Sequence, residues 1–563
     1  TPWLHNTVSL LSEMASVNIA SPIYIEPNEL PDSYYEKRMQ FPDPWTGGWW
    51  RLRDLVDYEL CLSMSLLKTG FLYKEDFLYN FYKMNRDNIK AGEKGNPYAF
   101  IIPKDQRDMP TALKMLDILK TAGVEIHQTE EEFAAGGKVY SAGSYVVKMA
   151  QPYRPYAQAL LEKQEYPDIR QYPGGPPEPP YDNAGWTLPL QMGVKCERIE
   201  NPFQAALTEV VEITYPRVKA PSKSSSYIVL DSKENASYSV AFGLLKEDSE
   251  VYRAQKSITG DDFKTAPGSF IVKNSGTVRD ILPGLLKKWH ASVYEIQDVS
   301  GIPKSPQTKP RVGLYQSWRS NMDEGWTRYV FDHKGISYVT LHNKDFRGEN
   351  GNPSNLGKDF DVIIFASEDG HVIKAGKPDP SSRYAGYHTR MPPKYRGGIE
   401  KEGVTALKQF VEDGGILVAM NEACELIFDE FGNVPVRNGT KRYDDDEFFC
   451  PTSLLRIKIK NDTPLGYGFD DEAAAMFSDS FGMDTWIPSG FWDREVVACY
   501  PKKDILLSGW LLGEDRIARK AAVVDLSYKK GHIVLIGIRC QHRAQSHGTY
   551  KFLFNSIFYP KNN

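Results

Sequence analysis

Ala142-Gly143-Ser144-Tyr145-Val146-Val147-Lys148 and Pro267-Gly268-Ser269-Phe270-Ile271-Val272-Lys273 are two versions of the same predicted strand, each opened by a Gly-Ser pair. An earlier pair of apolar runs, 99–103 and 226–230, keeps almost the same spacing. A helical segment and another short strand lie between the runs in each copy. Segments that stay in register at both ends indicate an internal duplication of one α/β unit, with copies near residues 98–150 and 226–274.

The duplicated unit belongs to the middle of three predicted regions, residues 97–302. Its two copies flank a Pro- and Gly-rich connector at 172–180, which is expected to be extended because proline removes backbone donors and fixes φ. The hairpin predicted within the first copy joins residues 138–140 to 144–149 around Ala142-Gly143.

The regions on either side are also predicted to be α/β. Residues 1–96 contain an apolar run, Thr7 to Leu11, that predicts an inner strand, followed by helical faces at 52–67 and 75–89. Residues 311–563 alternate short apolar strands with helices, a pattern typical of a parallel sheet covered on both faces. The fold class that we expect is therefore α/β, with tandem doubly wound domains in the later part of the chain.

Composition limits the function classes. The chain has 563 residues, and its 68 Lys and Arg against 73 Asp and Glu give a formal net charge of −5. This balance does not favour nucleic acid or anionic lipid as a partner. No apolar run approaches the ~18 residues of a membrane-spanning helix. The six cysteines form no C-x-x-C pair, and no G-x-G-x-x-G, P-loop, G-x-S-x-G or H-E-x-x-H motif is present.

Two further motifs are interpreted as structural. His127-Gln128-Thr129-Glu130 has the spacing of a zinc-ligand pair, but Arg253 stands at the position that corresponds to the histidine in the second copy. A strand-end histidine in a charged loop is therefore the preferred interpretation. The acidic run Tyr443 to Glu447 lacks the alternation of an EF-hand loop, and we expect a solvated loop rather than a calcium site.

Asn421-Glu422-Ala423-Cys424 follows an apolar strand and opens a helix. From Arg311 onward the chain resembles class I glutamine amidotransferase-like domains, in which a nucleophilic cysteine occupies such a strand-to-helix elbow. Here Asn421 or Glu422 fills the elbow, and Cys424 comes about one helical turn later. His542 and His547 follow the last strand, but neither has the glutamate two residues on that the family's histidine pairs with. The preferred interpretation is an amidotransferase-like domain without chemistry, and the alternative is a hydrolase that uses Cys424.

The start of the chain carries a second resemblance. From the pattern alone, Glu13 is a charge at the end of the predicted strand. The opening nevertheless resembles the C-terminal part of a zinc carboxypeptidase of the carboxypeptidase A type, and in particular large bacterial members with a long C-terminal extension. The segments that carry this resemblance are His5-Asn6-Thr7-Val8-Ser9-Leu10-Leu11-Ser12-Glu13-Met14-Ala15-Ser16-Val17, Trp45-Thr46-Gly47-Gly48-Trp49-Trp50-Arg51-Leu52-Arg53-Asp54 and Gln151-Pro152-Tyr153-Arg154-Pro155-Tyr156-Ala157.

The resemblance implies that Glu13 is the catalytic general base of a zinc metallocarboxypeptidase that hydrolyses peptides. It also implies a Zn²⁺ ion whose ligands lie upstream of this strand, so no metal ligand is assigned in this chain. The expected partner is a missing N-terminal carboxypeptidase part, in the same protein or a separate chain, without which the chain is expected to be inactive. Export to the periplasm or outside the cell is expected as well. The alternative from another functional class is a non-catalytic α/β binding protein.

Overall fold

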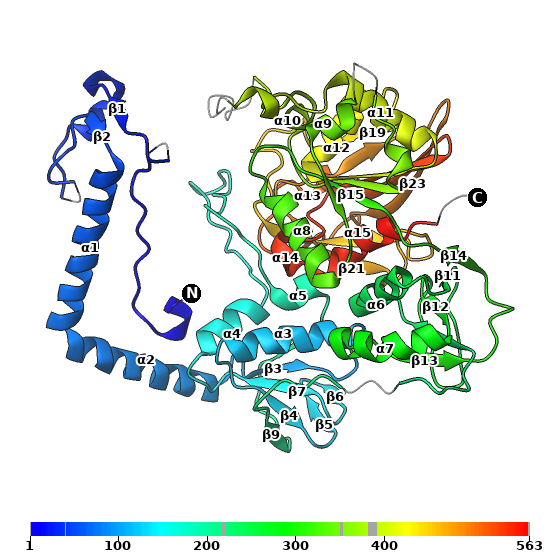
Figure 1. Ribbon diagram of the computed structural model, residues 1–563. Helices are drawn as coiled ribbons and strands as arrows, with labels where there is room; N and C mark the ends of the chain where they lie inside the picture. Colours follow the sequence, from blue (N-terminus) through cyan, green and yellow to red (C-terminus); the bar gives the residue numbers. More distant parts are fainter. Residues whose placement is uncertain are drawn as a thin grey trace. The chain divides into compact units, whose positions relative to one another are not determined.

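The computed structural model describes residues 2–17, 19–39, 41–216, 220–348, 353–380 and 391–560. The chain divides into two compact units, residues 1–98 with 149–157, and residues 99–148 with 158–563. The fold is α/β, with several separate sheets (Figure 1). Among the described residues, no helix is both long and apolar enough to cross a bilayer.

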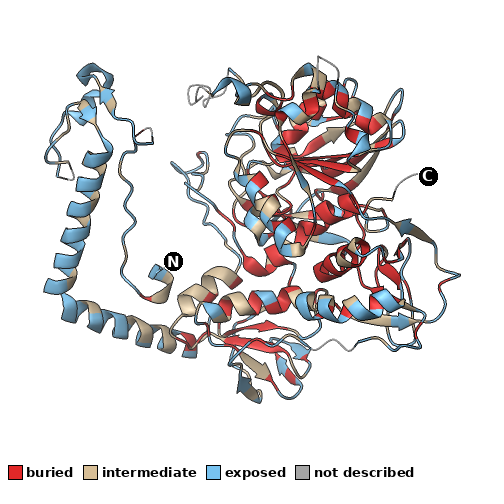
Figure 2. Ribbon diagram, viewed as in Figure 1, coloured by how far each residue is buried: buried red, intermediate tan, exposed pale blue. Residues whose placement is uncertain are grey.

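The first unit is built from two long helices and one small pair of strands. The antiparallel strands β1 (Ile23–Ile25) and β2 (Gly48–Trp50) precede α1 (Leu52–Leu72) and α2 (Lys74–Glu93), which confirms both predicted helices. Helix α1 begins where the Asp54 carboxylate accepts the backbone N–H of Arg51. No residue of α1 is buried, and Gly92 is the one buried residue of α2 (Figure 2). The helices therefore have little apolar core of their own.

The strand predicted over Thr7 to Leu11 is wrong for this structure. These residues are irregular, and the side chains of Val8, Leu10 and Leu11 are 60%, 64% and 78% exposed. A strand needs a neighbour to satisfy its backbone donors and acceptors. No described segment pairs with this run, so its apolar character produces no strand.

The second unit contains two five-stranded sheets with equivalent strand orders. The sheets run β8-β3-β7-β4-β9 and β13-β10-β12-β11-β14, and every neighbouring pair is antiparallel. Helices α3 (Met109–Thr121) and α6 (Asn235–Lys246) occupy the same place after the first strand of each copy. This shared order is the one that the internal duplication predicts. The strands are β3 (Ala99–Ile102), β4 (His127–Thr129), β7 (Tyr145–Lys148), β8 (Glu197–Ile199), β9 (Leu207–Glu209), β10 (Tyr227–Leu230), β11 (Val251–Ala254), β12 (Phe270–Lys273), β13 (Val293–Ile296) and β14 (Lys304–Gln307).

The Gly-Ser pair makes the same contacts in both copies. The Ser144 hydroxyl donates to the Ser141 carbonyl and accepts the Lys104 N–H, at 2.8 and 3.1 Å. The Ser269 hydroxyl donates to Ala266 and accepts from Ser232, at 2.7 and 3.2 Å. Each serine therefore ties the turn before its strand to the end of the neighbouring strand.

The preceding glycines have equivalent roles. Gly143 and Gly268 have φ values of +86° and +81°, a region that favours glycine. Their N–H groups donate at 2.8 Å to the backbone oxygens of Thr129 and Ala254. A Cβ at Gly268 would also lie 2.3 Å from the Tyr467 side chain. The Gly-Ser pair is thus required by backbone conformation as well as by hydrogen bonding.

The hairpin predicted between 138–140 and 144–149 is wrong. Strand β6 (Lys138–Tyr140) pairs with β5 (Phe133–Ala135), whereas β7 joins the main sheet between β3 and β4. At the turn around Gly143 the chain passes from the β5–β6 sheet to the five-stranded sheet, and no hairpin forms. The predicted turn at Ala142-Gly143 is present, but the strand after it pairs within the five-stranded sheet.

The largest sheet combines a parallel half and an antiparallel half. Strands β16 (Val339–Leu341), β15 (Val312–Tyr315), β17 (Val362–Phe365), β18 (Ile416–Met420) and β26 (Gly531–Ile536) are parallel, as the sequence predicts. The sheet then continues antiparallel through β25 (Ala521–Tyr528), β23 (Trp492–Cys499), β20 (Ser453–Ile459) and β21 (Glu472–Phe477). The sequence predicts a strand at 521–526 but not this antiparallel pairing.

Helices cover both faces of the parallel half. Val418 and Val534 share one core with α8 (Met322–Lys334) and α15 (Tyr550–Ile557). The alternate residues Leu417 and Leu535 share the other with α11 (Glu400–Glu412) and α12 (Cys424–Glu430). The remaining elements are α4 (Arg154–Leu161), α5 (Leu188–Met192), α7 (Gly276–Trp289), α9 (Asn343–Arg347), α10 (Gly370–Ala375), α13 (Glu514–Ile517), α14 (His542–Gln545), β19 (Val436–Asn438), β22 (Met483–Thr485), β24 (Leu506–Ser508) and short 3-10 helices such as η7 (Asn421–Ala423).

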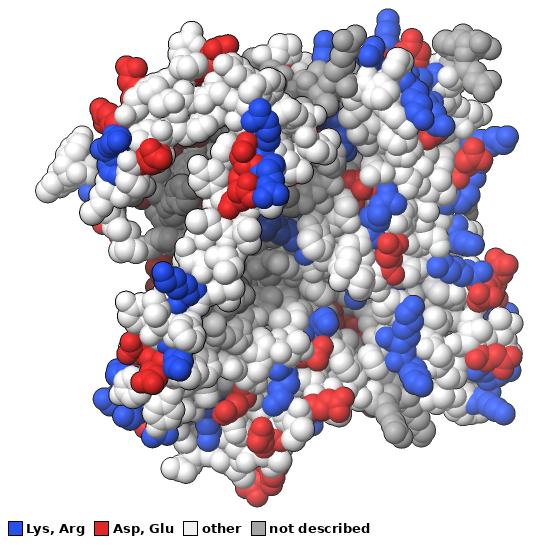
Figure 3. Space-filling view, turned by 60° about the vertical axis from the view of Figure 1, so that its left-hand side comes forward, with Lys and Arg blue, Asp and Glu red and all other residues white. Residues whose placement is uncertain are grey.

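Positive and negative side chains are mixed on the surface, in keeping with their nearly equal numbers in the sequence. On the face drawn in Figure 3, the described lysines and arginines are interspersed with acidic residues instead of forming one continuous basic surface. Long-range attraction of a polyanion therefore gains no support from this face.

Candidate functional site

A strained residue marks the carboxyl end of β18. Asn421 follows the strand directly, has a φ of +50° and is fully buried. Asparagine tolerates this left-handed region better than most residues, at some energetic cost. Its Nδ2 donates to the backbone oxygen of Asp479 at 2.7 Å, whereas its Oδ1 has no hydrogen-bond partner among the described residues. The strand-to-helix elbow predicted from the sequence is thus occupied by Asn421.

Cys424 lies one turn further on and belongs to the core. It is 0% exposed, and its Sγ donates to the backbone oxygen of Ala419 at 3.2 Å. Burial raises the pKa of the Cys424 thiol well above its ordinary value. Because a nucleophilic cysteine needs an accessible thiolate, this placement argues against a hydrolase that uses Cys424.

The two candidate histidines are not arranged as bases for that thiol. His542 begins α14, and burial together with the charges of Arg539 and Arg543 lowers its pKa to about 4. His547 stacks on Tyr550 with ring centroids 4.7 Å apart, and its pKa is lowered to about 3, chiefly by burial. No hydrogen bond in the described part of the chain joins either ring to Cys424.

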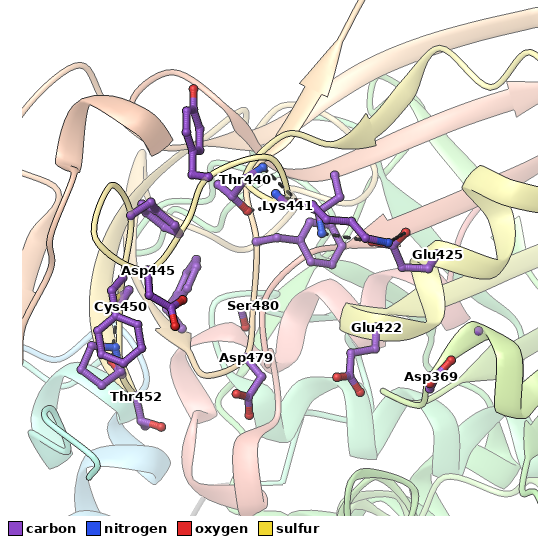
Figure 4. A pocket seen from close by; sticks show the side chains of 18 of the residues that line it. Asp369, Glu422, Glu425, Thr440, Lys441, Asp445, Cys450, Thr452, Asp479 and Ser480 are labelled. Atoms are coloured by element: carbon purple, nitrogen blue, oxygen red, sulfur yellow. Dashed lines mark hydrogen bonds and ion pairs between the residues drawn. The ribbon is translucent and has the colours of Figure 1, made fainter. Parts of the chain in front are cut away.

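A pocket of about 680 Å³ opens beside the elbow. Its lining comes from the segments that follow β17, β18 and β21, from the loop 438–452 and from residues 182 and 183 (Figure 4). Ligands of open α/β sheets bind outside the carboxyl ends of the strands, which is where Asp369 and Glu422 lie. Eight of the lining residues are acidic, namely Asp182, Asp369, Asp379, Glu422, Glu425, Asp429, Asp445 and Asp479, and Lys441 and His371 are the basic ones.

Only some of these carboxylates have a cationic partner. Lys441 lies 3.3 Å from Glu425, and the Arg539 guanidinium lies 3.4 Å from Asp479. Glu422 has no ion pair with a described residue; desolvation of its carboxylate raises its pKa, the attraction of the Arg539 guanidinium opposes this rise, and the charges of Asp479 and Asp369 add to it. In the view of Figure 4, Glu422 lies between Asp369 and Asp479 along one side of the pocket. The pocket is therefore a region of accumulated negative charge.

A second carboxylate near this edge, that of Glu368, has a raised pKa. Glu368 follows β17, accepts a hydrogen bond from Ser317 at 2.6 Å, and has a pKa raised to about 7 by burial. Arg539 at the end of β26 donates to Asp323 and to the backbone oxygen of Ser478. Acidic and basic groups from four strand ends thus meet at one edge of the sheet.

The described residues do not fit a zinc site. Nowhere among them do three or more His, Cys, Asp or Glu side chains come together as a metal would require. Glu13 is exposed in the irregular segment that follows Leu11, and His127 and Glu130 lie at strand β4 and just beyond it, where Glu130 accepts a hydrogen bond from Thr208. The described part of the chain therefore offers no group of zinc ligands beside Glu13.

The acidic run that ends at Glu447 forms a turn-rich loop. Tyr443 and Asp445 line the pocket, so the loop contributes to this site. Sequence reasoning identified Asn421 and Glu422 but missed Asp369, Asp429 and Asp479. Asp369 and Asp479 each come a few residues after a strand end, which is a usable signal once the strand order is known.

Comparisons with known proteins give structural neighbours only. No protein-family model matches the chain, and no curated protein is significantly similar to it. Solved structures that align with it include a cytoplasmic protein from Salmonella typhimurium (12% identity, 45% of this chain, 100% of that chain, TM-score 0.27). A ThuA-like protein from Bacteroides uniformis aligns at 13% identity over 44% of this chain and 89% of that chain, with a TM-score of 0.25. PurLQS from Thermotoga maritima aligns at 16% identity over 44% of this chain and 97% of that chain, with a TM-score of 0.27. Similarities this weak do not assign a function to the chain.

Proposed function

We propose that the chain is the C-terminal portion of a zinc carboxypeptidase, in which residues 1–96 complete the catalytic domain and Glu13 is the general base. The zinc ligands and the substrate pocket would come from a carboxypeptidase part outside these residues. Residues 97–302 and 311–563 would form its C-terminal extension. The chain by itself would be inactive.

The observation that carries this proposal is the exposed apolar surface of the first unit. Leu60, Met64 and Leu67 repeat along one stretch of α1 at helical spacing and are 56%, 58% and 66% exposed. The run 7–11 exposes a further set of apolar side chains. Large exposed apolar surfaces mark sites that another part of a protein covers. A carboxypeptidase sheet that pairs with residues 7–11 and covers α1 would bury both.

Glu13 has the accessibility that a general base requires. Its carboxylate is exposed and is not engaged in an ion pair with any described residue. In the assembled enzyme it would take a proton from the attacking water and return it to the leaving amine. The neighbouring segment is fixed to α1 by the hydrogen bond from Ser12 to Glu59, at 3.0 Å.

The test is a Glu13→Gln substitution in the assembled enzyme. We expect peptide hydrolysis to fall by roughly 10²–10⁴-fold, because loss of a general base commonly has this effect. Bound zinc, measured by elemental analysis, should stay at the wild-type level. Glu36→Gln, at an exposed site in the same unit, is the matched control and should leave hydrolysis unchanged. Full activity of the Glu13 variant would refute the assignment.

A second candidate concerns residues 311–563. Asn421 at the elbow and the burial of Cys424 favour an amidotransferase-like domain that binds a ligand and performs no thiol chemistry. This candidate does not exclude the first, because the two functions use different units.

A further inference from the structure

Arg107 is a mostly buried cation whose hydrogen-bonding capacity is largely unused. It lies between β3 and α3, and its side chain is only 12% exposed. A guanidinium carries five N–H donors. Among the described residues, that of Arg107 makes one hydrogen bond, to the backbone oxygen of Gly468 at 3.4 Å. Its nearest carboxylate, that of Asp470, lies 3.9 Å away and is 63% exposed, so this ion pair is long and contributes little.

Arg107 lines a cavity of about 270 Å³ in the second unit. Most of the remaining wall is apolar and comes from three segments that are distant in the sequence. An apolar cavity with a few polar groups is the usual form of a small-molecule site, and this one is just smaller than the roughly 300–1,000 Å³ that suits drug-sized ligands. The apolar lining residues are Pro189, Leu190, Val194, Ala473, Ala474 and Leu507.

Two glycines leave space beside the guanidinium. Gly193 and Gly548 both line the cavity. A Cβ at Gly193 would lie 3.4 Å from Nη2 of Arg107 and 3.2 Å from Cα of Gly548. Gly193 also has a φ of +67°, a region that favours glycine. A side chain at this position would fill the space next to Nη2, so the glycine keeps that edge of the guanidinium accessible.

The walls of the cavity are held in place by hydrogen bonds. The Gln106 side chain accepts the backbone N–H of Lys195 and donates to the Lys195 carbonyl, at 2.9 and 3.0 Å. The Thr187 hydroxyl donates to that of Ser508 at 2.8 Å, next to the lining residue Leu507. The cavity is therefore formed before a ligand arrives, which reduces the entropic cost of binding.

The charges in the lining favour an anion. Glu472 is paired with Arg456 at 2.6 Å, so these two neutralise each other. The charged lining residues that remain are two cations, Arg107 and Lys195, and one carboxylate, Asp470. Because the side chain of Asp470 is largely exposed, it can turn toward solvent when a better partner occupies Arg107.

We propose that this cavity binds a carboxylate attached to a short apolar body. The guanidinium of Arg107 would hold the carboxylate, and Leu190 and Leu507 would contact the apolar part. A guanidinium and a carboxylate match as a planar, bidentate pair, and Arg107 has the free donors for it. The carboxylate would be that of a free organic acid or of a peptide C-terminus. The site lies in the second unit, so the proposal does not rest on Glu13 or on residues 1–96.

The experiment is calorimetric titration of the full chain with 4-methylpentanoate, a free acid, and with N-acetyl-Gly-Leu, a peptide C-terminus with a similar apolar body. The matched controls are the amides of both compounds, which lack the charge. We expect at least one carboxylate to bind, and its amide to bind about tenfold more weakly or worse, because the charge-assisted pair is lost. Binding of the free acid would show that the carboxylate and apolar body suffice, whereas binding of the peptide alone would identify a peptide C-terminus.

Variants then locate the site. Arg107→Gln should weaken binding about tenfold or more, and Arg107→Lys should give an intermediate affinity because it keeps the charge but not the planar donors. Asp470→Asn should strengthen binding, since it removes the competing carboxylate, and a purely structural role of Arg107 predicts no such gain. Lys256→Gln, at an exposed site outside the cavity, should bind as the wild type does. Unfolding temperatures show which variants are folded, and Asp470→Asn tests the site even where an Arg107 variant does not fold.

Three results would overturn the proposal. They are no binding of either carboxylate at millimolar concentration, equal binding of the amides, and an affinity that changes neither in the folded Arg107 variants nor in Asp470→Asn. Binding of inorganic phosphate without binding of either carboxylate would also overturn it, in favour of an inorganic oxyanion site. None of these outcomes depends on peptide hydrolysis, so failure here is distinguishable from failure of the carboxypeptidase proposal.

Discussion

At the scale of single residues, burial decides which cysteine can react. Cys424 and Cys540 are buried, whereas Cys61 on α1 is exposed. Burial raises the pKa of Cys540 to about 12 and that of Cys424 further. From the sequence, Cys424 could be placed only near the predicted strand-to-helix elbow at Asn421. The inward direction of its side chain depends on the register of α12 against the sheet, which the sequence did not provide.

Alkylation should follow this difference. In the folded chain, we expect iodoacetamide to modify Cys61 rapidly and to spare Cys424 and Cys540, because the thiolate is the reactive form and both buried thiols remain protonated. Peptide mass spectrometry after timed quenching measures the three rates. Denatured protein is the control and should react at all sites. Rapid labelling of native Cys424 would restore it as a candidate nucleophile.

Glu234 is predicted to make stability depend on pH. It precedes α6, is buried, and accepts hydrogen bonds from the N–H and hydroxyl of Ser292 at 2.7 and 2.6 Å. Burial, together with the charge of Asp108, raises its pKa from 4.5 to about 7. Because the folded state favours the protonated acid, this contribution to stability is present below pH 4.5 and is lost as pH rises to about 7.

The measurement compares the wild type with Glu234→Gln, which stays neutral at every pH. The variant should gain stability relative to the wild type between pH 4.5 and 7, by up to about 3 kcal/mol, since one pKa unit corresponds to ~1.4 kcal/mol. Thermal unfolding followed across this range gives the difference. Glu247→Gln, at an exposed site after the same helix, should track the wild type. A constant difference between wild type and Glu234→Gln would rule out the titration.

Among the helices and strands, the sequence predicted many of the individual segments but not which strands pair with one another. Strands such as β10, β17 and β18 are short runs of apolar residues bounded by turn signals, and they form where expected. The run 7–11 has the same composition but no neighbour, so it stays irregular. Antiparallel strands β20, β21 and β23 were not predicted because charged residues such as Arg456 and Glu495 interrupt β20 and β23, and β21 is largely alanine, which is depleted in strands. The sequence predicted the elbow at Asn421 and Glu422 because it follows a recognisable strand, but it did not predict the pocket, since residues such as Asp479 follow the unpredicted strand β21.

The two Gly-Ser turns offer a test of the duplication at this scale. Ser269→Ala removes the acceptor of the Ser232 N–H, and Ser144→Ala removes that of the Lys104 N–H. Ser269→Ala should cost about 1–3 kcal/mol, because the buried Ser232 N–H is left unsatisfied, and Ser144→Ala should cost less, because Lys104 is exposed and water can reach its N–H. Hydrogen exchange should accelerate at Ser232 in the first variant and at Lys104 in the second, by ~10-fold or more. Each variant is the control for the other, and acceleration spread over both sheets would contradict equivalent, independent turns.

At the scale of the whole molecule, the two units differ in how much core they possess. The strands of the second unit are lined by residues that are almost wholly buried, such as Val229, Val418 and Leu535. The first unit exposes most of the apolar side chains of α1 and α2, including Phe71 at 73% and Leu78 at 71%. A helix pair with an uncovered apolar face gains little from hydrophobic burial, which is the main source of helix stability in proteins.

This contrast predicts the behaviour of the chain in solution. Residues 1–563 expressed alone should bind the apolar dye ANS and associate with themselves, because exposed apolar surface favours both. A chain that begins at Lys94 should bind less dye and be monodisperse by light scattering, since it lacks both α1 and α2 but keeps the sheets of the second unit. Supplying the zinc-binding carboxypeptidase part should reduce dye binding by the full chain and protect residues 7–11 from hydrogen exchange. The shortened chain is the control, and its dye binding should not change on that addition. A full chain that is monodisperse, dye-free and already protected at residues 7–11 would mean that this surface needs no partner, and the proposal that it completes a carboxypeptidase would lose its main support.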